Sequence, residues 1–339
     1  MTLSVAIAGL GYFSQFHQDA WSRCSNVRVI AVADPDPAKR QAALRLFPEA
    51  EGYDDAEAML AATRPDILDL VTPPAAHLRL VEAAAAHRIA VVCQKPLAPD
   101  WDTAVALVEA AERAGITLAV HENFRFMPWF REAKNLVLAG RIGTPLHVSF
   151  RLRPGDGQGP DAYLARQPYF QSMPRFLIHE TGIHLIDVFR FLLGEVSGVF
   201  ARLKRFNPVI TGEDAGIVVF DFQSGATGVF DGNRHVSHPS ADPRMTNGVM
   251  LLEGTGGTIR LDGYGRLFTM PNGGAETEHV YAWENRGYGG DCVFHQIRHI
   301  VDHFTRGTPL VNDGRAYLRN IAIEEAIYRS DKEGRYIDV

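Results

Sequence analysis

The apolar positions in the first third of the chain form short continuous runs that are separated by helix-forming stretches. Five of these runs have the composition of buried strands, at residues 5–8, 27–33, 67–71, 89–93 and 116–120. Three alanine-rich stretches lie between them, at residues 37–47, 77–88 and 102–114. Alanine has the highest helix propensity. Strands that alternate with helices predict a parallel sheet that is covered by helices on both faces, and continuous apolar strands fit such a buried sheet.

The pattern changes after residue 121, where longer runs with strand character begin. A helical stretch at 128–139 precedes six expected strands, at 147–153, 198–205, 216–222, 227–233, 249–253 and 258–261. Turns such as Gln223-Ser224-Gly225 separate some of these strands, and strands joined by short turns are usually antiparallel. Two more helical stretches follow, at 290–304 and 314–329.

These patterns predict an α/β protein with two domains, which is usual for a chain of 339 residues. Residues 1–121 are expected to form a doubly wound parallel sheet. Residues 122–339 are expected to form an α+β domain with an open, mainly antiparallel sheet, and the pattern leaves open whether the C-terminal helix packs back on the first domain. We expect a homo-oligomer, a dimer or a tetramer, formed through this second sheet, because Val218, Phe220 and Phe222 would otherwise leave an apolar face in water.

Composition and charge narrow the function classes. Hydrophobic residues make up 46% of the chain and charged residues 22%, which is typical of globular proteins. The net charge is -6 without any basic block, so no nucleic-acid partner is expected. The sequence contains no run of about 18 apolar residues, so no membrane span is predicted. The first residues lack the features of a signal peptide. The three cysteines, Cys24, Cys93 and Cys292, are odd in number and far apart, which indicates reduced thiols. The expected location is therefore the cytoplasm.

The first chemical motif is Gly9-Leu10-Gly11-Tyr12-Phe13-Ser14. It lies between a predicted strand and a predicted helix, as does the dinucleotide-binding fingerprint G-x-G-x-x-G, and it has serine in place of the third glycine. Gly9 allows the tight turn, and Gly11 lets the backbone approach a pyrophosphate at the helix N-terminus. Asp34 ends the second strand, where a carboxylate accepts hydrogen bonds from the ribose hydroxyls and repels a 2′-phosphate. The motif therefore predicts a Rossmann domain that prefers NAD over NADP.

Three further motifs point to a family. They are Thr72-Pro73-Pro74-x-x-His77, Cys93-Gln94-Lys95-Pro96-Leu97-Ala98 and Glu180-x-x-x-His184-x-x-Asp187. Together with the glycine-rich turn, they resemble the glucose–fructose oxidoreductase, inositol dehydrogenase and rhizopine catabolism family (Gfo/Idh/MocA). The resemblance covers nearly the whole chain. It implies an NAD-dependent oxidoreductase and does not specify the substrate.

The glycine-rich turn and the resemblance together define an expected cofactor site. Its members are Gly9, Gly11, Tyr12, Phe13, Asp34, Thr72, Pro73, His77, Gln94, Lys95 and Asn123. Gln94 stands where the family has a glutamate that contacts the nicotinamide ribose, and it keeps the hydrogen-bonding capacity without the charge. Glu180 likewise replaces the aspartate of the family motif Asp-x-Gly-x-His, whose histidine is His184.

Oxidation of an alcohol requires a hydride acceptor, which the cofactor supplies, and a base that takes the hydroxyl proton. On an α-helix, Glu180, His184 and Asp187 would share one face, and a carboxylate can fix the tautomer of a catalytic imidazole. Lys95 follows a buried strand and is suited to stabilise a developing alkoxide. The expected catalytic residues are therefore Lys95, His184 and Glu180.

The expected substrate is a small polar, carbohydrate-like molecule. The residues expected to bind it are Lys95, Arg125, Arg153, Tyr163 and His184. Arg125 is included because of the resemblance, whereas Arg153 and Tyr163 belong to a long loop near 154–174 or its flank, which is expected to be a lid or a mobile insert. Arginine suits carboxylates and multiple hydroxyls. We expect hydride transfer between NAD and a secondary hydroxyl or ketone of a sugar, sugar acid or polyol.

Two alternative functions stay open, as some relatives use NAD for glycoside hydrolysis or elimination without net redox change, and a nucleotide-sensing regulator without catalytic activity could use the same fold. A metal site is not expected. The run His179-Glu180-x-x-x-His184 is similar to a zinc-protease helix, but its i,i+5 spacing on an α-helix turns His179 away from His184.

Overall fold

The computed structural model describes residues 2–339, which form two compact units. The first unit comprises the chain up to Asn123 together with Val293–Arg319. The second unit comprises Phe124–Cys292 and Asn320–Val339. The sequence patterns placed a single boundary at residue 121, whereas the structure groups the late segment Val293–Arg319 with the first unit.

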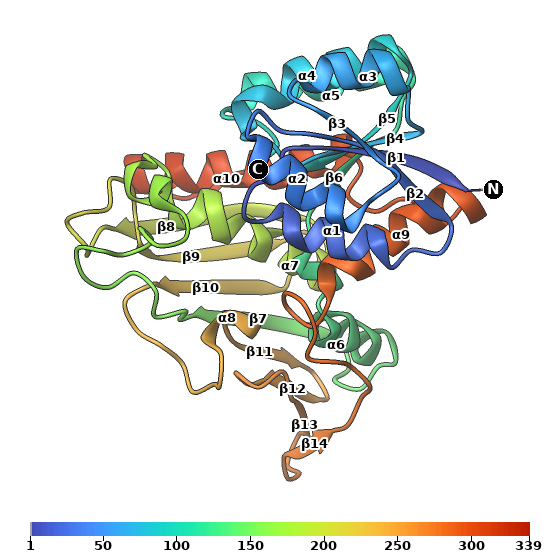
Figure 1. The fold of residues 1–339 in the computed structure, drawn as a ribbon. Helices are drawn as coiled ribbons and strands as arrows, with labels where there is room; N and C mark the ends of the chain where they lie inside the picture. Colours follow the sequence, from blue (N-terminus) through green and yellow to red (C-terminus); the bar gives the residue numbers. More distant parts are fainter. Residues whose placement is uncertain (1) are drawn as a thin grey trace. The chain divides into compact units, whose positions relative to one another are not determined.

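The first unit is built on a six-stranded parallel sheet in the order β3-β2-β1-β4-β5-β6 (Figure 1). Its strands are β1 (Leu3–Ala8), β2 (Val27–Ala33), β3 (Glu51–Tyr53), β4 (Ile67–Leu70), β5 (Ala90–Gln94) and β6 (Leu118–His121). The strand order reverses between β1 and β4, and doubly wound sheets bind their ligands at such a point, outside the carboxyl ends of the strands. The predicted doubly wound sheet is therefore present.

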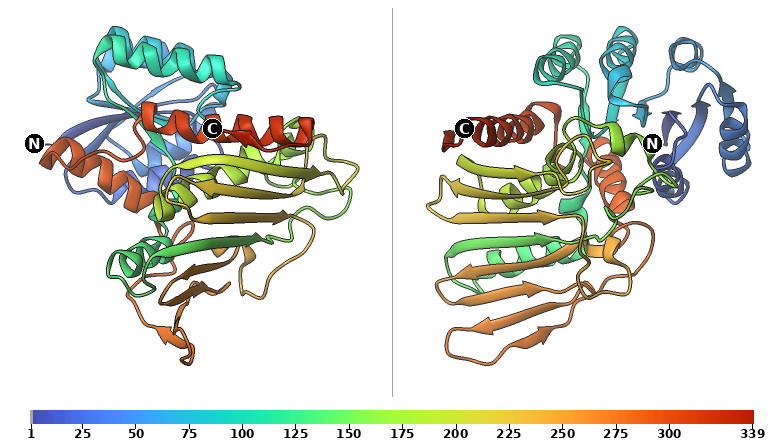
Figure 2. Two further views of the ribbon diagram at one scale, coloured as in Figure 1. Left: turned by 180° about the vertical axis from the view of Figure 1, so that it is seen from behind. Right: turned by 90° about the vertical axis from the view of Figure 1, so that its left-hand side faces the viewer.

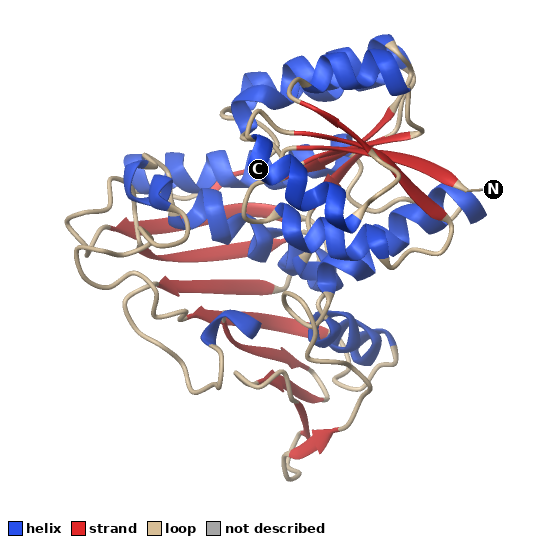
Figure 3. Ribbon diagram, viewed as in Figure 1, coloured by secondary structure: helices blue, strands red, loops and turns tan. Residues whose placement is uncertain are grey.

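Helices lie on both faces of this sheet, as Figure 3 shows. They are α1 (Ser14–Ser22), α2 (Pro37–Leu46), α3 (Ala56–Thr63), α4 (His77–Ala86) and α5 (Trp101–Ala114). Asp36, Asp55 and Asp100 cap α2, α3 and α5, since each carboxylate accepts a hydrogen bond from a backbone N–H of the first turn. Gly115 ends α5 in the left-handed conformation, with φ +65°, which glycine adopts without strain.

The second unit is built on a nine-stranded sheet in the order β14-β13-β12-β11-β7-β10-β9-β8-β15 (Figure 2). The strands are β7 (Pro145–Leu152), β8 (Val196–Lys204), β9 (Ala215–Phe222), β10 (Thr227–Asn233), β11 (Gly248–Gly254), β12 (Gly257–Leu261), β13 (Leu267–Pro271), β14 (Thr277–His279) and β15 (Ile337–Asp338). The pair of β7 and β10 is parallel, and the other pairs are antiparallel. The predicted mainly antiparallel sheet is confirmed.

Two helices pack on one face of this sheet, α6 (Pro128–Leu138) and α7 (Ile183–Leu193). Phe130 of α6 lies 6.2 Å from Phe150 of β7 between ring centroids, and Phe189 of α7 lies 5.5 Å from Phe220 of β9. These contacts place the core of the unit between the helices and the inner face of the sheet. A short helix, α8 (Pro243–Thr246), precedes β11.

The outward face of β9 differs from the expectation. Val218, Phe220 and Phe222 are only 0%, 1% and 3% exposed, because they point toward α7 and form part of the core. Ile217 and Val219 face outward instead, with 53% and 38% of their surface exposed. Both faces of this strand are apolar, so the alternation fixes the period of the strand and not which face is buried.

The segment after β7 contains structure of its own. A short 3₁₀ helix at Pro168–Ser172 follows several turns. Tyr163, Phe170 and Phe176 form a buried cluster with Ala162 and Ile210. The long loop expected near 154–174 is therefore held by a buried apolar cluster to which its own residues contribute.

Two long helices lie near the C-terminus, α9 (Cys292–Arg306) and α10 (Gly314–Glu333). Both begin within a few residues of the predicted starts. In the part of the chain that the structure describes, no helix is both long enough and apolar enough to cross a membrane.

Candidate active site

The glycine-rich turn after β1 combines a crowded glycine with an open one. Gly9 has φ +90°, and a Cβ atom there would lie 2.6 Å from the backbone carbon and oxygen of Val71. Its N–H donates to the carbonyl oxygen of Ala33 at 2.8 Å, which joins the turn to β2. A Cβ atom at Gly11 would meet no atom within 4 Å. Gly9 is thus needed for packing, whereas Gly11 leaves open space beside the backbone where a phosphate could approach.

Ser14 occupies the third glycine position of the fingerprint and is fully buried. Its hydroxyl donates to the carbonyl oxygen of Gly11 at 2.7 Å and accepts a hydrogen bond from the Gln18 amide at 3.0 Å. The small side chain therefore fits the close approach of α1 and also braces the turn.

Asp34 follows β2 and connects this strand to the glycine-rich turn. One carboxylate oxygen accepts a hydrogen bond from the backbone N–H of Leu10 at 2.8 Å, and the other accepts from the N–H of Asp36 at 2.9 Å. Each oxygen has a second lone pair that can accept from a ribose hydroxyl. The Arg40 guanidinium donates to the carbonyl oxygens of Asp34 and Pro35, so this cation lies beside the carboxylate.

The loop after β4 contains a buried polar atom without a partner. The Oγ1 atom of Thr72 has no hydrogen-bond partner in the described chain, although buried hydroxyls are normally satisfied. Together with the open space at Gly11 and the carboxylate of Asp34, this hydroxyl fits a site that is completed by a dinucleotide.

His77 is enclosed, and this differs from the predicted cofactor contact. Its two ring nitrogens lie 3.0 Å from the carbonyl oxygen of Leu97 and 2.8 Å from that of Thr72. The side chain is fully buried, and this burial lowers the pKa of the imidazole. His77 therefore ties the loop after β4 to the loop after β5 and supports the site without lining its surface.

The end of β5 carries Gln94 and Lys95. The Gln94 side-chain oxygen accepts a hydrogen bond from the backbone N–H of Lys95 at 2.6 Å. Its amide nitrogen lies 3.0 Å from Nε2 of His17 on α1. Lys95 is half-buried and is followed by a cis peptide bond to Pro96. His17 was not among the site residues predicted from the sequence.

The remaining predicted cofactor residues also follow strands of the first unit. Tyr12 and Phe13 end the glycine-rich turn, Pro73 follows Thr72, and Asn123 comes two residues after β6. Tyr12 is exposed and Asn123 is buried. Because β1, β2, β4, β5 and β6 are parallel, the structure brings the predicted cofactor residues to the carboxyl edge of one sheet.

In the second unit, His184 is the second residue of α7. It is 5% exposed, and its ring stacks on Phe124 with a centroid distance of 3.9 Å and an interplanar angle of 3°. The preceding turn, Leu177–Gly182, is a π-helix. The predicted shared face of Glu180 and His184 requires one continuous α-helix, and this prediction was wrong, because π-turns change the angular spacing of side chains.

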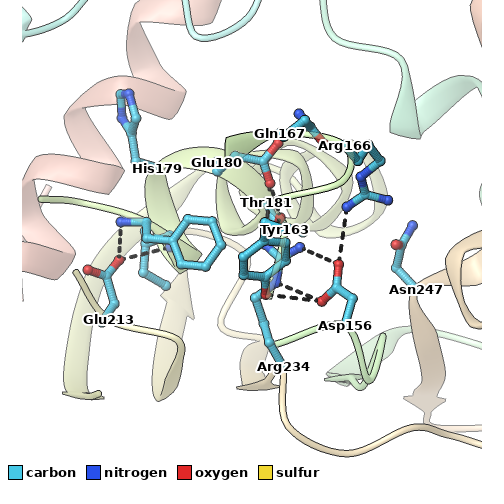
Figure 4. A network of polar contacts seen from close by, with 12 residues as sticks. Asp156, Tyr163, Arg166, Gln167, His179, Glu180, Thr181, Glu213, Arg234 and Asn247 are labelled. Carbon is cyan, nitrogen blue, oxygen red and sulfur yellow. Dashed lines mark hydrogen bonds and ion pairs between the residues drawn. The ribbon is translucent and has the colours of Figure 1, made fainter. Parts of the chain in front are cut away.

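The Glu180 carboxylate belongs to a network around Arg234 (Figure 4). It accepts a hydrogen bond from the Thr181 hydroxyl at 2.5 Å and lies 3.4 Å from Nη1 of Arg234. Arg234 is buried and forms a two-point ion pair with Asp156, at 3.1 Å and 2.9 Å. Tyr163 donates to the same aspartate at 3.2 Å. This network fixes the start of the 154–174 segment against β10 and the π-turn.

Aromatic rings surround this buried cation. The Arg234 guanidinium lies 4.7 Å from the ring centroid of Phe176, 5.1 Å from that of Tyr163 and 5.7 Å from that of Phe170. Burial raises the pKa of Asp156, but Arg234 and Arg166 lower it by more, so that it lies below its ordinary value of 3.8. The aspartate is therefore ionised at neutral pH.

The arginines predicted to bind substrate have acidic partners in the second unit. Arg125 donates to both oxygens of Asp187, at 2.6 Å and 2.5 Å. Arg153 donates to the Asp231 carboxylate at 2.5 Å and to two backbone carbonyl oxygens. The structure therefore uses both guanidinium groups to hold elements together, and neither is the open fork that the sequence suggested.

His179 points toward α10. Its Nδ1 atom lies 2.6 Å from the carboxylate of Glu324. His179 and His184 thus have different surroundings, with His179 at α10 and His184 stacked on Phe124.

Family models match both parts of the chain. Residues 3–122 match the model described as oxidoreductase family, NAD-binding Rossmann fold, named GFO/IDH/MocA. Residues 130–260 match the model described as GFO/IDH/MocA C-terminal domain.

Individual proteins match over nearly the full length. The D-apiose dehydrogenase of Rhizobium rhizogenes is 34% identical over 343 residues, covering 99% of this chain and 97% of the relative. The crystal structure of an oxidoreductase from Agrobacterium radiobacter in complex with NAD+, L-tartaric acid and magnesium has a TM-score of 0.90 at 33% identity, covering 100% of this chain and 98% of that chain. Levoglucosan dehydrogenase in complex with NADH and levoglucosan is 19% identical with a TM-score of 0.84, over 100% of both chains, and shares the fold.

Proposed function

The chain belongs to the GFO/IDH/MocA oxidoreductase family, and we propose that it transfers a hydride between NAD and a secondary hydroxyl or ketone of a neutral sugar or polyol. The family, the enzyme class and the NAD cofactor that the sequence predicted are confirmed. The substrate class and the roles of individual residues are our proposal.

The residues of the first unit fit NAD. The open backbone at Gly11 would hold the pyrophosphate, Asp34 would accept hydrogen bonds from the adenosine ribose, and the Thr72 hydroxyl and the Gln94 amide would contact the cofactor farther along the sheet edge. When bound, NAD supplies the hydride acceptor. The protein supplies binding, orientation and the proton acceptor.

His184 is the proposed acid–base group. Its ring plane is fixed by the stack on Phe124, and histidine is the side chain that most often exchanges a proton with a reacting hydroxyl. By the family resemblance, Lys95 is the proposed cation that stabilises the negative charge on the substrate oxygen. We keep Glu180 as the acidic residue among the proposed catalytic residues. Its carboxylate is held in place by Thr181 and Arg234.

One observation favours a neutral substrate over a sugar acid. The arginines between residues 151 and 175 all have an acidic partner within the second unit: Arg153 pairs with Asp231, which the exposed Arg151 shares at 3.6 Å, Arg166 pairs with Asp156, and Arg175 pairs with Glu325. Arg125 is paired with Asp187 in the same way. A guanidinium that is already matched by a carboxylate offers little net attraction to a substrate carboxylate. The name of a similar protein, D-apiose dehydrogenase, also refers to a neutral sugar.

The test is a substrate panel with NAD in which NADH formation is followed by absorbance. The neutral compounds are D-apiose, myo-inositol and levoglucosan, and the acids are glucuronate, galacturonate and L-tartrate, which accompanies a similar structure. We expect turnover with at least one neutral compound and a higher kcat/KM for neutral compounds than for the acids. Turnover confined to the acids would contradict the proposed substrate class.

The same assay separates hydride transfer from the alternatives. A dehydrogenase releases one NADH for each molecule of substrate that is oxidised. Glycoside cleavage without net redox change would consume substrate while free NADH stays constant, and a sensor would bind NAD without consuming substrate. Product analysis by chromatography beside the absorbance reading distinguishes these three outcomes.

A further inference from the structure

A buried carboxylate lies in β4, and the proposed hydride transfer does not use it. Asp69 is fully buried within the otherwise apolar strand Ile67–Leu70. Its Oδ2 atom accepts a hydrogen bond from the Trp21 indole at 2.7 Å, and both carboxylate oxygens lie 3.0 Å from Nδ1 of His17. Burying a charge is costly unless donors of this kind surround it. Asp69 therefore holds the ring of His17, a residue of α1.

The opposite side of the His17 ring meets Gln94. Nε2 of the fully buried His17 lies 3.0 Å from the Gln94 amide nitrogen, and the Gln94 oxygen accepts from the Lys95 backbone N–H at 2.6 Å. We call these three residues the Asp69–His17–Gln94 network. It runs from the interior of β4, through α1, to the end of β5.

The backbone N–H of Lys95 determines where the protons lie in the Asp69–His17–Gln94 network. Only an acceptor can face that N–H, so the Gln94 oxygen points to Lys95 and its NH₂ group points to His17. Nε2 of His17 must then accept, and its proton must be on Nδ1, where the Asp69 carboxylate accepts it. The opposite amide orientation would set two donors against each other at Lys95. The network thus specifies a neutral His17 that is protonated at Nδ1.

We propose that His17 and Asp69 are positioning residues for the cofactor site. Through Gln94 they fix a carboxamide and the adjoining backbone of Lys95, at the sheet edge that carries the other cofactor residues. The second N–H of the Gln94 amide and the second lone pair of its oxygen are left to contact the ligand. The amide lets His17 stay neutral, whereas a carboxylate at position 94 would require a second proton on His17 to make the same contact.

Among the described residues, the titratable groups that face the His17 ring include Asp69 from β4 and His121 from β6. The ring centroids of His17 and His121 are 4.1 Å apart. Each of these groups can carry a charge beside the ring. The proton state of His17 is therefore to be observed directly and not deduced from activity.

The first test is nitrogen NMR of the unmodified full-length protein, without cofactor and with ¹⁵N-labelled histidine. The His17 signals are assigned by their loss in His17→Gln. We expect a neutral ring at neutral pH, with Nδ1 protonated and Nε2 unprotonated. Gln94→Glu is expected to convert the same ring to the doubly protonated form. A protonated Nε2 in the unmodified protein overturns the proposal, and this measurement does not depend on any variant folding.

The second test measures NAD affinity by calorimetry. His17→Ala removes the acceptor of the Gln94 amide, and a net loss equal to one or two neutral hydrogen bonds predicts binding weaker by about tenfold. His17→Gln retains an acceptor and should recover part of this loss. His87→Gln, at the end of α4, is the matched control and should bind NAD like the unmodified protein. Unchanged NAD affinity in a folded His17→Ala protein overturns the positioning role.

Discussion

The carboxylate of Asp34 accepts a hydrogen bond from the backbone N–H of Leu10 at 2.8 Å. The residue at the end of β2 thus holds the glycine-rich turn that follows β1. The second lone pair of the same oxygen can accept from a ribose hydroxyl. Structural support and cofactor selection therefore depend on one side chain, and a substitution there has to be designed to separate the two effects.

Asp34→Asn should reduce the preference for NAD. Asparagine can still accept from Leu10 through its one oxygen, but its NH₂ group then faces the Asp36 N–H, and it loses the charge that repels a 2′-phosphate. Hydrogen bonds to charged groups contribute about 1 kcal/mol more than neutral ones, so NAD binding should weaken by about tenfold. NADP binding should improve, because Lys39 lies 3.9 Å from the Asp34 carboxylate and Arg40 is adjacent.

Calorimetric titration with both cofactors checks this change. Asp36→Asn, which alters the cap of α2, is the matched control and should leave the ratio of the two affinities unchanged. Equal affinities for NAD and NADP in the unmodified protein would contradict the selective role of Asp34.

The two glycines of the turn should respond differently to substitution. Gly11→Val places a side chain in open space, so the midpoint of unfolding should hardly change while NAD binding is lost. Gly9→Ala should destabilise the fold by at least about 1–2 kcal/mol, because the left-handed backbone and the nearby Val71 both oppose a Cβ atom. Thermal unfolding and calorimetry on both variants provide the comparison. NAD binding at full affinity by Gly11→Val would remove Gly11 from the site.

Much of the first unit could be predicted because its strands are continuous apolar runs and its helices are rich in alanine. The prediction missed β3, whose three residues Glu51–Tyr53 have no apolar pattern. It also missed the π-turn at Leu177–Gly182, because a π-turn and an α-turn contain the same residue types. The buried face of β9 was assigned wrongly since both faces of that strand are apolar.

The candidate site was predicted well where a sequence motif specifies the backbone conformation. It was predicted less well where the hydrogen-bond partners of a side chain decide what that side chain does. Gly9, Gly11 and Asp34 lie at the turn that the fingerprint requires. The sequence does not show that Arg153 would meet Asp231 or that His77 would be enclosed against Leu97, because these partners lie 78 and 20 residues away in the chain. Asp69 had a signal, since a charged residue within a buried apolar strand needs a partner.

His184→Asn should lower turnover by roughly 10²–10⁴, the usual contribution of general acid–base catalysis. Asparagine preserves much of the side-chain volume next to Phe124 and cannot exchange a proton near neutral pH. NAD affinity should be unchanged, because the proposed NAD-binding residues belong to the first unit. Steady-state kinetics on the best substrate of the panel, with calorimetry for NAD, is the measurement. Turnover within threefold of the unmodified enzyme would transfer the acid–base role to another residue.

The outward face of the second sheet is expected to form an interface between copies of the chain. Phe200 of β8 lies opposite Val219 of β9, and with Ile217 they form an exposed apolar patch. Light scattering should show a dimer or tetramer for the unmodified protein and a smaller species for Val219→Lys. Val280→Lys, at an exposed valine just after β14, is the control and should not change the mass. A monomer for the unmodified protein at micromolar concentration would exclude the interface.

Arg234→Met should be among the most destabilising substitutions in the second unit. It leaves Asp156 buried without its main partner, and removal of one member of a buried ion pair typically costs about 3–5 kcal/mol. The double variant with Asp156→Asn should lose less than the sum of the two single losses, because both residues act in one network. Arg202→Met, at an exposed position on β8, is the control and should remain close to the unmodified protein.

The pH dependence of this loss identifies its cause. The pKa of Asp156 is lowered in the folded protein, so the aspartate stabilises the fold at any pH above its unfolded value, and this contribution disappears as the pH falls through the lower folded value. The difference in unfolding free energy between the unmodified protein and Arg234→Met should therefore be constant from pH 5 to pH 8 and should shrink below about pH 4. Denaturant unfolding at a series of pH values measures it. A difference that stays constant down to pH 3 would mean that Arg234 acts through its packing against Tyr163, Phe170 and Phe176 and not through its charge.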